Sequence, residues 1–142
     1  MKKQQKFLTP KSKPLPIRGL IPRHKLDLTR AQAAVAAGYP AIAPVLPELL
    51  EWLQDYNWPV AHILQPFLAG IGLPLAPHLR RILQTDDEVW KYWVIVCLIK
   101  ESAALQAEFR HELTRLATSP TVRETREELP QVASETLQLL HE

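Results

Sequence analysis

Three acidic residues in a row are the first candidates for chemistry in this sequence. Asp86, Asp87 and Glu88 are consecutive, and carboxylate oxygens are the ligands that divalent cations prefer. The triplet also follows Thr85, and Thr85 and Glu88 have the spacing of a capping box, in which negative charge stabilises the start of a helix. We favour the capping interpretation, and we predict no metal site and no cofactor.

Nucleophiles and metal ligands give no stronger signal. His111-Glu112 begins like the H-E-x-x-H zinc motif, but Arg115 stands where the second histidine would be needed. Cys97 is the single cysteine, so intramolecular disulfides and multi-thiolate zinc sites are excluded, and its apolar neighbours predict an inert buried thiol. The other histidines lack ligand spacing: His24, His62, His78 and His141. We therefore predict no enzymatic activity, and an active site between repeats is our third hypothesis.

Four tryptophans are a notable feature of a chain of 142 residues. Large amphipathic rings near turns are typical of protein-binding surfaces, but they also fill the space between helical layers. Trp58 and Trp90 fall at equivalent places in the repeat described below, which favours packing. Trp52 has no aromatic equivalent, so it is the better candidate for an interface.

The charge is distributed unevenly along the chain. The first 18 residues hold six of the 17 Lys and Arg and none of the 15 Asp and Glu, so the rest of the chain carries −4. We expect residues 1–18 to form a basic, solvated arm and residues 19–142 to form the folded domain. A basic arm could contact nucleic acid, and this is our alternative function, although the acidic body argues against it.

Hydrophobic runs are too short for membrane insertion. The basic start, Met1 to Lys6, is followed by only two apolar residues, so we expect no secretory signal. The longest apolar run, Tyr92 to Ile99, has eight residues, whereas a membrane helix needs about 20. We expect a cytoplasmic protein.

Apolar spacing and proline punctuation predict six or seven short helices. Val60, Leu64, Phe67 and Ile71 share one helical face, for example. The run Trp90–Ile99 could be a buried strand, but no partner strand is visible, so we predict a helix and expect it to be the most buried element. The expected helices lie near 29–37, 44–55, 58–71, 75–83, 88–99, 105–116 and 120–140.

Several residues should begin, bend or end these helices. The expected N-caps are Asp27 or Thr29, Asn57, Thr85, and Ser119 with Pro120. Pro66 and Pro130 should cause bends, and Gly38 and Gly72 should end helices.

A repeat with a period near 34 links these helices. Gly38 and Pro40 recur 34 residues later as Gly72 and Pro74, and Asp55 and Trp58 recur 32 residues later as Asp87 and Trp90. Each unit is a helix, a short acidic turn and a second helix. Because one pair cannot bury its own apolar face, neighbouring pairs must stack, which predicts an all-α fold and a short right-handed α-solenoid.

Three blocks carry a family resemblance, Ile21–Asp27, Leu50–Val60 and Asp86–Trp93. Helix pairs of this length, with an early proline and an aspartate in the turn, resemble HEAT-like repeats. Over about 20–140 the chain is similar to a family of small bacterial proteins recorded only as a domain of unknown function. The resemblance implies an all-helical HEAT-like fold and no established activity, and it leaves residues 1–18 outside.

We therefore predict a non-catalytic protein–protein interaction module of the bacterial cytoplasm. The narrower hypothesis is an immunity or antitoxin protein that blocks a toxin, prompted by size and architecture. The partner should be another protein that contacts the face formed by the second helix of each pair, while the sequence leaves the oligomeric state open. The candidate partner-binding residues are Trp52, Trp58, Asp86, Asp87, Lys91 and Tyr92.

Overall fold

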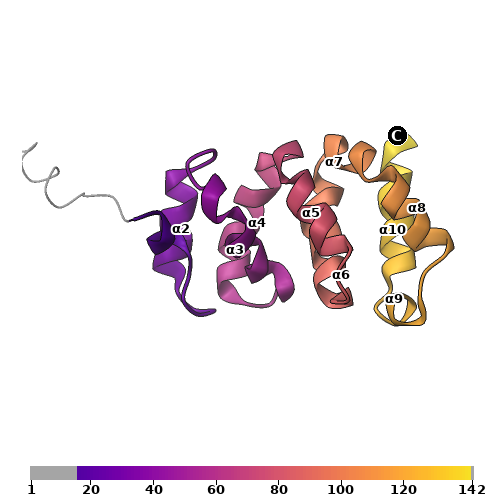
Figure 1. The fold of residues 1–142 in the computed structure, drawn as a ribbon, viewed down its shortest axis with the longest axis horizontal. Coiled ribbons are helices and arrows are strands. Elements are labelled where there is room, and N and C mark those ends of the chain that lie inside the picture. Colours follow the sequence, from indigo (N-terminus) through magenta and orange to yellow (C-terminus); the bar gives the residue numbers. More distant parts are fainter. Residues whose placement is uncertain (1–15, 142) are drawn as a thin grey trace, which may run out of the picture.

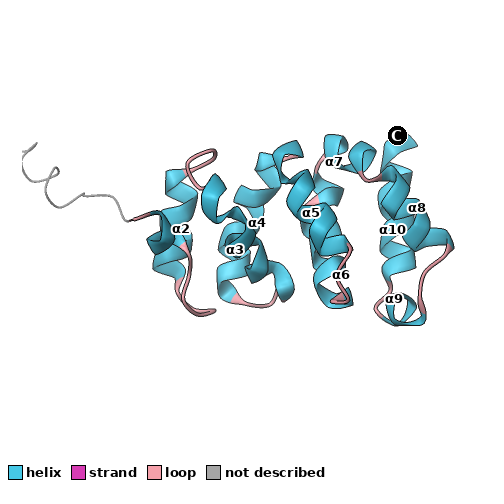
Figure 2. Cartoon of the chain, viewed as in Figure 1, coloured by secondary structure: helices cyan, strands magenta, loops and turns pink. Residues whose placement is uncertain are grey.

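The computed structural model describes residues 16–141, and every regular element among them is helical (Figure 2). The all-α prediction is thereby confirmed. The α-helices are α2 (Leu28–Ala37), α3 (Leu46–Leu50), α4 (Pro59–Ile71), α5 (Ala76–Leu83), α6 (Glu88–Cys97), α7 (Ala103–Glu108), α8 (Arg110–Thr118), α9 (Val122–Arg126) and α10 (Leu129–Gln138). Short 3-10 turns extend or connect them, and the first is η1 (Ile17–Leu20). Most of the basic arm expected at 1–18 lies outside the described residues.

The helices follow one another along the long axis in chain order (Figure 1). The turns within successive pairs lie along one edge, at the bottom of that view. Hydrogen bonds tie each turn to the next layer: Val60 N donates to the Lys25 carbonyl at 3.1 Å, and Trp90 Nε1 donates to the Leu50 carbonyl at 3.1 Å. Arg123 Nη2 makes the same kind of link to the Asp86 carbonyl at 3.0 Å.

A single apolar core runs through these layers. Fully buried side chains come from every helical pair, among them Leu50, Leu64, Leu79, Ile95 and Phe109. Each layer is only two helices thick, so a helix buries its apolar face both against its partner, as α8 does against α10, and against the next layer, as α2 does against α4.

The period differs from the one that the sequence suggested. The first helical segments of successive pairs begin at Ala43, Leu73 and Ala103, which are thirty residues apart rather than 34. Gly38 and Gly72 both end helices with a positive φ, 76° and 74°, as expected. The connection after Gly38 contains residues 39–42, whereas Leu73 begins the next segment directly after Gly72, so the glycine spacing overstated the period.

Nine α-helices replace the expected six or seven among the described residues because two predicted helices are divided. The helix expected over 105–116 breaks at Phe109, which has φ −102° and ψ 16°. The helix expected over 120–140 breaks at Glu128, which has a φ of 62°, and α10 then starts with Pro130 in its first turn. Pro130 thus marks the start of a new helix, where its missing N–H costs little.

Three of the expected N-caps are wrong, while Asp27 is confirmed, its Oδ1 accepting from Arg30 N at 3.4 Å. The Thr85 hydroxyl donates to the Ile82 carbonyl at 2.7 Å and accepts from Asp87 N at 3.3 Å, whereas the Asp87 carboxylate is the group that accepts from Trp90 N in the first turn of α6. The observed N-cap residues of α4, α6 and α9 are Trp58, Asp87 and Thr121. Each lies one or two residues after the expected one, which was Asn57, Thr85 or Ser119, respectively.

The run that could have been a strand is helix α6, as predicted, but we expected it to be the most buried element and part of it is exposed. Val89 is 42% exposed, whereas the charged residues Glu88 and Lys91 are buried. Pro66 lies inside α4, which continues unbroken past it to Ile71.

Among the described residues, no single helix is long and apolar enough to cross a bilayer. Helix α4 and the segment Leu73–Leu83 reach that length and composition only when taken together, and the chain bends by 108° between them.

Candidate functional site

A surface hollow of about 510 Å³ lies where the start of α6 faces α9. It is lined by Thr85, Asp86, Asp87, Glu88, Val89, Arg123, Arg126 and Glu127. A second hollow of about 270 Å³ shares Val89, Arg126 and Glu127 with the first and extends along α6 to Tyr92 and Trp93. The two hollows are therefore adjacent, and we call them together the α6–α9 groove.

The two walls of the groove are fixed by their N-caps. Asp87 Oδ1 accepts from Trp90 N at 3.0 Å and sets the first turn of α6. On the other wall, Thr121 and Glu124 form the capping box that was expected at Thr85: Thr121 Oγ1 accepts from Glu124 N at 3.1 Å, and Glu124 Oε1 accepts from Thr121 N at 2.9 Å. Both walls therefore have a defined start despite the short length of α9.

Buried charges join the walls beneath the groove. Glu88, Lys91 and Glu124 are only 8%, 4% and 3% exposed. The Lys91 ammonium lies 3.3 Å from Glu124 Oε2 and 3.5 Å from Glu88 Oε2, so one cation links α6 with α9. Burying three charges is tolerable only because each faces an opposite charge at close range.

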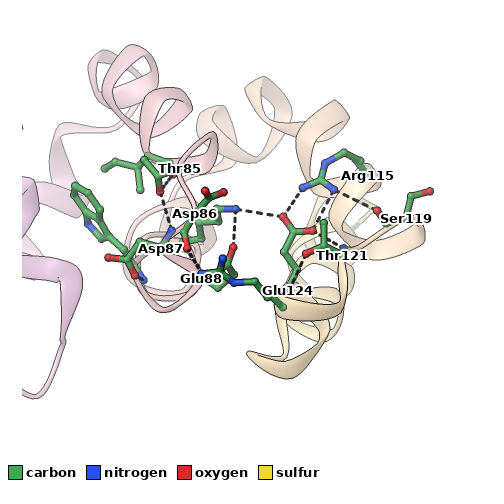
Figure 3. Close-up of polar contacts among 12 residues, drawn as sticks. Thr85, Asp86, Asp87, Glu88, Arg115, Ser119, Thr121 and Glu124 are labelled. Atoms are coloured by element: carbon green, nitrogen blue, oxygen red, sulfur yellow. Dashed lines mark hydrogen bonds and ion pairs between the residues drawn. The ribbon is translucent and has the colours of Figure 1, made fainter.

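Two arginines complete this network, as Figure 3 shows around Glu124. Arg115, on α8, binds Glu124 in a bidentate manner, with Nη2–Oε2 at 2.7 Å and Nη1–Oε1 at 3.2 Å. Arg123, on α9, reaches back to Glu88 Oε1 at 3.1 Å. Helices α6, α8 and α9 are thus held by one continuous set of ion pairs.

The network keeps Glu124 ionised. Burial alone would raise its pKa, but the hydrogen bonds from Arg115, from the Thr121 backbone and from Lys91 hold the pKa at about 2. At neutral pH the carboxylate therefore accepts hydrogen bonds and does not act as a proton donor. The network is suited to positioning the groove rather than to acid–base chemistry.

Three of the six candidate residues meet in the groove. Asp86 and Asp87 line its larger hollow, and Tyr92 lines the other hollow beside Trp93, with ring centroids 5.2 Å apart. Lys91 lies beneath the surface at 4% exposure, so it supports the groove and cannot contact a partner directly.

Trp52 and Trp58 lie apart from the groove. They pack edge to face with ring centroids 5.5 Å apart and line a different hollow, at the turn between α3 and α4. Trp90 is half-buried and uses its indole N–H to bind the Leu50 carbonyl, which agrees with the packing role suggested by the repeat.

The sequence did not single out Arg115, Arg123, Glu124 and Arg126 as site residues. The pair Thr121 and Glu124 carries the capping-box spacing and could have marked the start of α9. The arginines carry no local signal, since their partners lie on other helices or in other turns.

His78 and Thr85, a possible base and a possible nucleophile, both line a further hollow of about 160 Å³ between α3 and α5. The Thr85 hydroxyl is committed to the Ile82 carbonyl at 2.7 Å. The pKa of His78 is lowered by burial and by the positive charge of Arg81. Burial likewise raises the pKa of Cys97 to about 12, which supports the prediction of an inert thiol.

Comparison with known proteins places the domain in a defined family. Residues 20–137 match the model of a family described as a domain of unknown function (DUF5071). No curated protein is significantly similar to the chain.

Proposed function

The chain belongs to the DUF5071 family, and we propose that it is a non-catalytic protein–protein interaction module of the bacterial cytoplasm. In this proposal the stacked helical pairs form a short right-handed solenoid of HEAT-like hairpins. Family membership supplies no activity, so the proposal rests on the α6–α9 groove.

One observation carries the proposal: buried ion pairs lie beneath the groove, and charged side chains without partners among the described residues line its surface. The side chains of Asp86 and Arg126 form no hydrogen bond or ion pair within residues 16–141, and both line the groove. Val89, which also lines the groove, is 42% exposed. Aromatic and arginine side chains beside exposed apolar ones are typical of residues that dominate binding energy at protein interfaces.

The floor explains why such a surface could bind without rearranging. Five residues of α9 would not form a stable helix alone, but the ion pairs of Glu124 and Arg123 hold them against α6 and α8. A preorganised surface loses less conformational entropy when a partner binds.

The proposal can be tested by affinity capture with the full-length chain and an Asp86→Ala/Arg126→Ala double variant. Both side chains are exposed and neither forms a hydrogen bond or ion pair within residues 16–141, so we expect the variant to unfold at the same temperature as the wild type. A protein captured by the wild type should be recovered roughly tenfold less well by the variant, as for loss of interface residues worth over 1 kcal/mol.

The matched control is Glu135→Ala, on α10, whose carboxylate lies 3.4 Å from the Lys100 ammonium, outside the groove. This variant should capture the partner as well as the wild type does. Equal recovery by the double variant would exclude the groove as the binding surface.

A further inference from the structure

The hollow at the turn between α3 and α4 has a volume of about 260 Å³ and differs from the α6–α9 groove in the residues that line it. We call it the tryptophan cup; its main walls are Ile21, Pro22, Glu48, Glu51, Trp52 and Trp58. It combines two indole rings with two carboxylates, and no basic residue lines it.

The two rings form a fixed corner. Trp52 and Trp58 have centroids 5.5 Å apart and planes at 71°, and both pack against the core. The turn between them is held by Asp55, whose Oδ1 accepts from Asn57 N at 2.9 Å and whose carbonyl accepts from Trp58 N at 3.1 Å. Pro59 follows in the first turn of α4 and restricts the backbone further. The corner is therefore present before any ligand binds.

Glu48 leaves an unsatisfied negative charge beside this corner. Its Oε1 is buried and has no hydrogen-bond partner among the described residues. Its Oε2 lies 3.6 Å from Arg18 Nη1, but the Arg18 side chain is 69% exposed, so this ion pair is weak. A carboxylate oxygen that is shielded from water and has no donor is costly, and the positive charge of a cation in the cup would offset part of that cost.

We propose that the tryptophan cup binds an alkylammonium group. Indole rings attract cations through their faces, and two rings at a steep angle surround a compact, rounded cation better than a planar guanidinium, which stacks on one face. Glu48 and Glu51 supply the compensating negative charge. The site does not depend on the interaction proposed for the α6–α9 groove.

The charge requirement is tested by titrating the full-length protein with choline and with 3,3-dimethylbutan-1-ol, which has the same shape without the charge. Indole N–H signals in ¹H–¹⁵N NMR spectra report the four tryptophans separately. Choline should shift the signals of Trp52 and Trp58 while Trp90 is unaffected, and it should bind roughly tenfold more tightly than the neutral alcohol. Equal binding of both compounds, or no shift up to roughly 100 mM choline, would overturn the proposal.

Variants then test the residues. Glu48→Gln should weaken choline binding roughly fivefold, and Trp52→Leu should weaken it at least as much, whereas Glu135→Gln should leave it unchanged. Because Trp52 also packs against the core, Glu48→Gln provides the decisive comparison if Trp52→Leu does not fold. Unchanged affinity in Glu48→Gln would contradict the assigned role of that carboxylate.

A last titration identifies the source of the ammonium group. Nα-acetyl-lysine amide and its Nε-trimethylated form each carry an alkylammonium group on a peptide unit. Tighter binding of either compound than of choline would indicate a lysine side chain of a protein as the natural ligand. Tighter binding of choline would indicate a free small molecule.

Discussion

Replacing Glu124 by Gln removes the central charge of the buried network while keeping the size of the side chain. The pKa of Glu124 is about 2 in the folded protein, against an ordinary value of 4.5. Because the folded-state pKa is the lower one, the network's contribution to stability is complete above pH 4.5 and is lost as the pH falls towards 2. A pKa shift of one unit corresponds to about 1.4 kcal/mol, so the Glu124 charge contributes at most about 3 kcal/mol to the free energy of unfolding.

Solvent screening reduces this value, because the Arg115 side chain is 45% exposed although that of Glu124 is only 3% exposed. We therefore expect Glu124→Gln to lower the free energy of unfolding by about 1.5–3 kcal/mol at pH 7. Urea titrations of both proteins between pH 7 and pH 2.5 measure this difference. It should stay constant down to about pH 4.5 and then shrink as the wild type loses the same charge.

Glu135→Gln serves as the matched control for this experiment. The Glu135 side chain is 63% exposed and its ion pair with Lys100 lies at the surface, so the expected change is below about 0.5 kcal/mol. A difference between Glu124→Gln and wild type that stays constant down to pH 2.5 would refute the electrostatic argument and point to packing instead.

Three further perturbations test other parts of the structure. Trp90→Phe removes the hydrogen bond to the Leu50 carbonyl that joins two layers, and urea titration should show a loss of about 1 kcal/mol. Gly72→Ala should lower the unfolding temperature because φ is 74° there, whereas Gly70→Ala, inside α4 with no atom within 4 Å of the new Cβ, should maintain or raise it. Cys97, with a pKa of about 12 and 4% exposure, should react with a disulfide reagent at pH 8 roughly a hundredfold more slowly in the native than in the denatured protein.

Helical periodicity predicted the elements and much of the core. Val60, Leu64, Phe67 and Ile71 were placed on one face of a helix; in α4 the first two are fully buried and the last two are half-buried. The helix starts were less predictable because neighbouring polar side chains compete for the same backbone groups. Thr85 and Asp87 both have capping side chains, but the Thr85 hydroxyl accepts from Asp87 N, and it is the Asp87 carboxylate that accepts from Trp90 N in the first turn of α6.

The candidate site was only partly predictable, for a reason that lies in sequence separation. Lysine is rarely buried, so Lys91 was expected at the surface. It is buried because Glu124, 33 positions further along the chain, lies 3.3 Å from its ammonium. Local spacing cannot show such a pair, since it forms only when α9 is placed against α6.

The same network explains how a thin stack of helices can present a defined binding surface. Stacking buries apolar side chains between layers, but apolar contacts alone have little directional preference. The ion pairs of Glu124 with Lys91 and Arg115 fix distances between three helices, because a displaced member would leave a charge buried without a partner. The apolar core thus stabilises the order of the layers, while the buried charges determine the position of α9 and with it the shape of the α6–α9 groove.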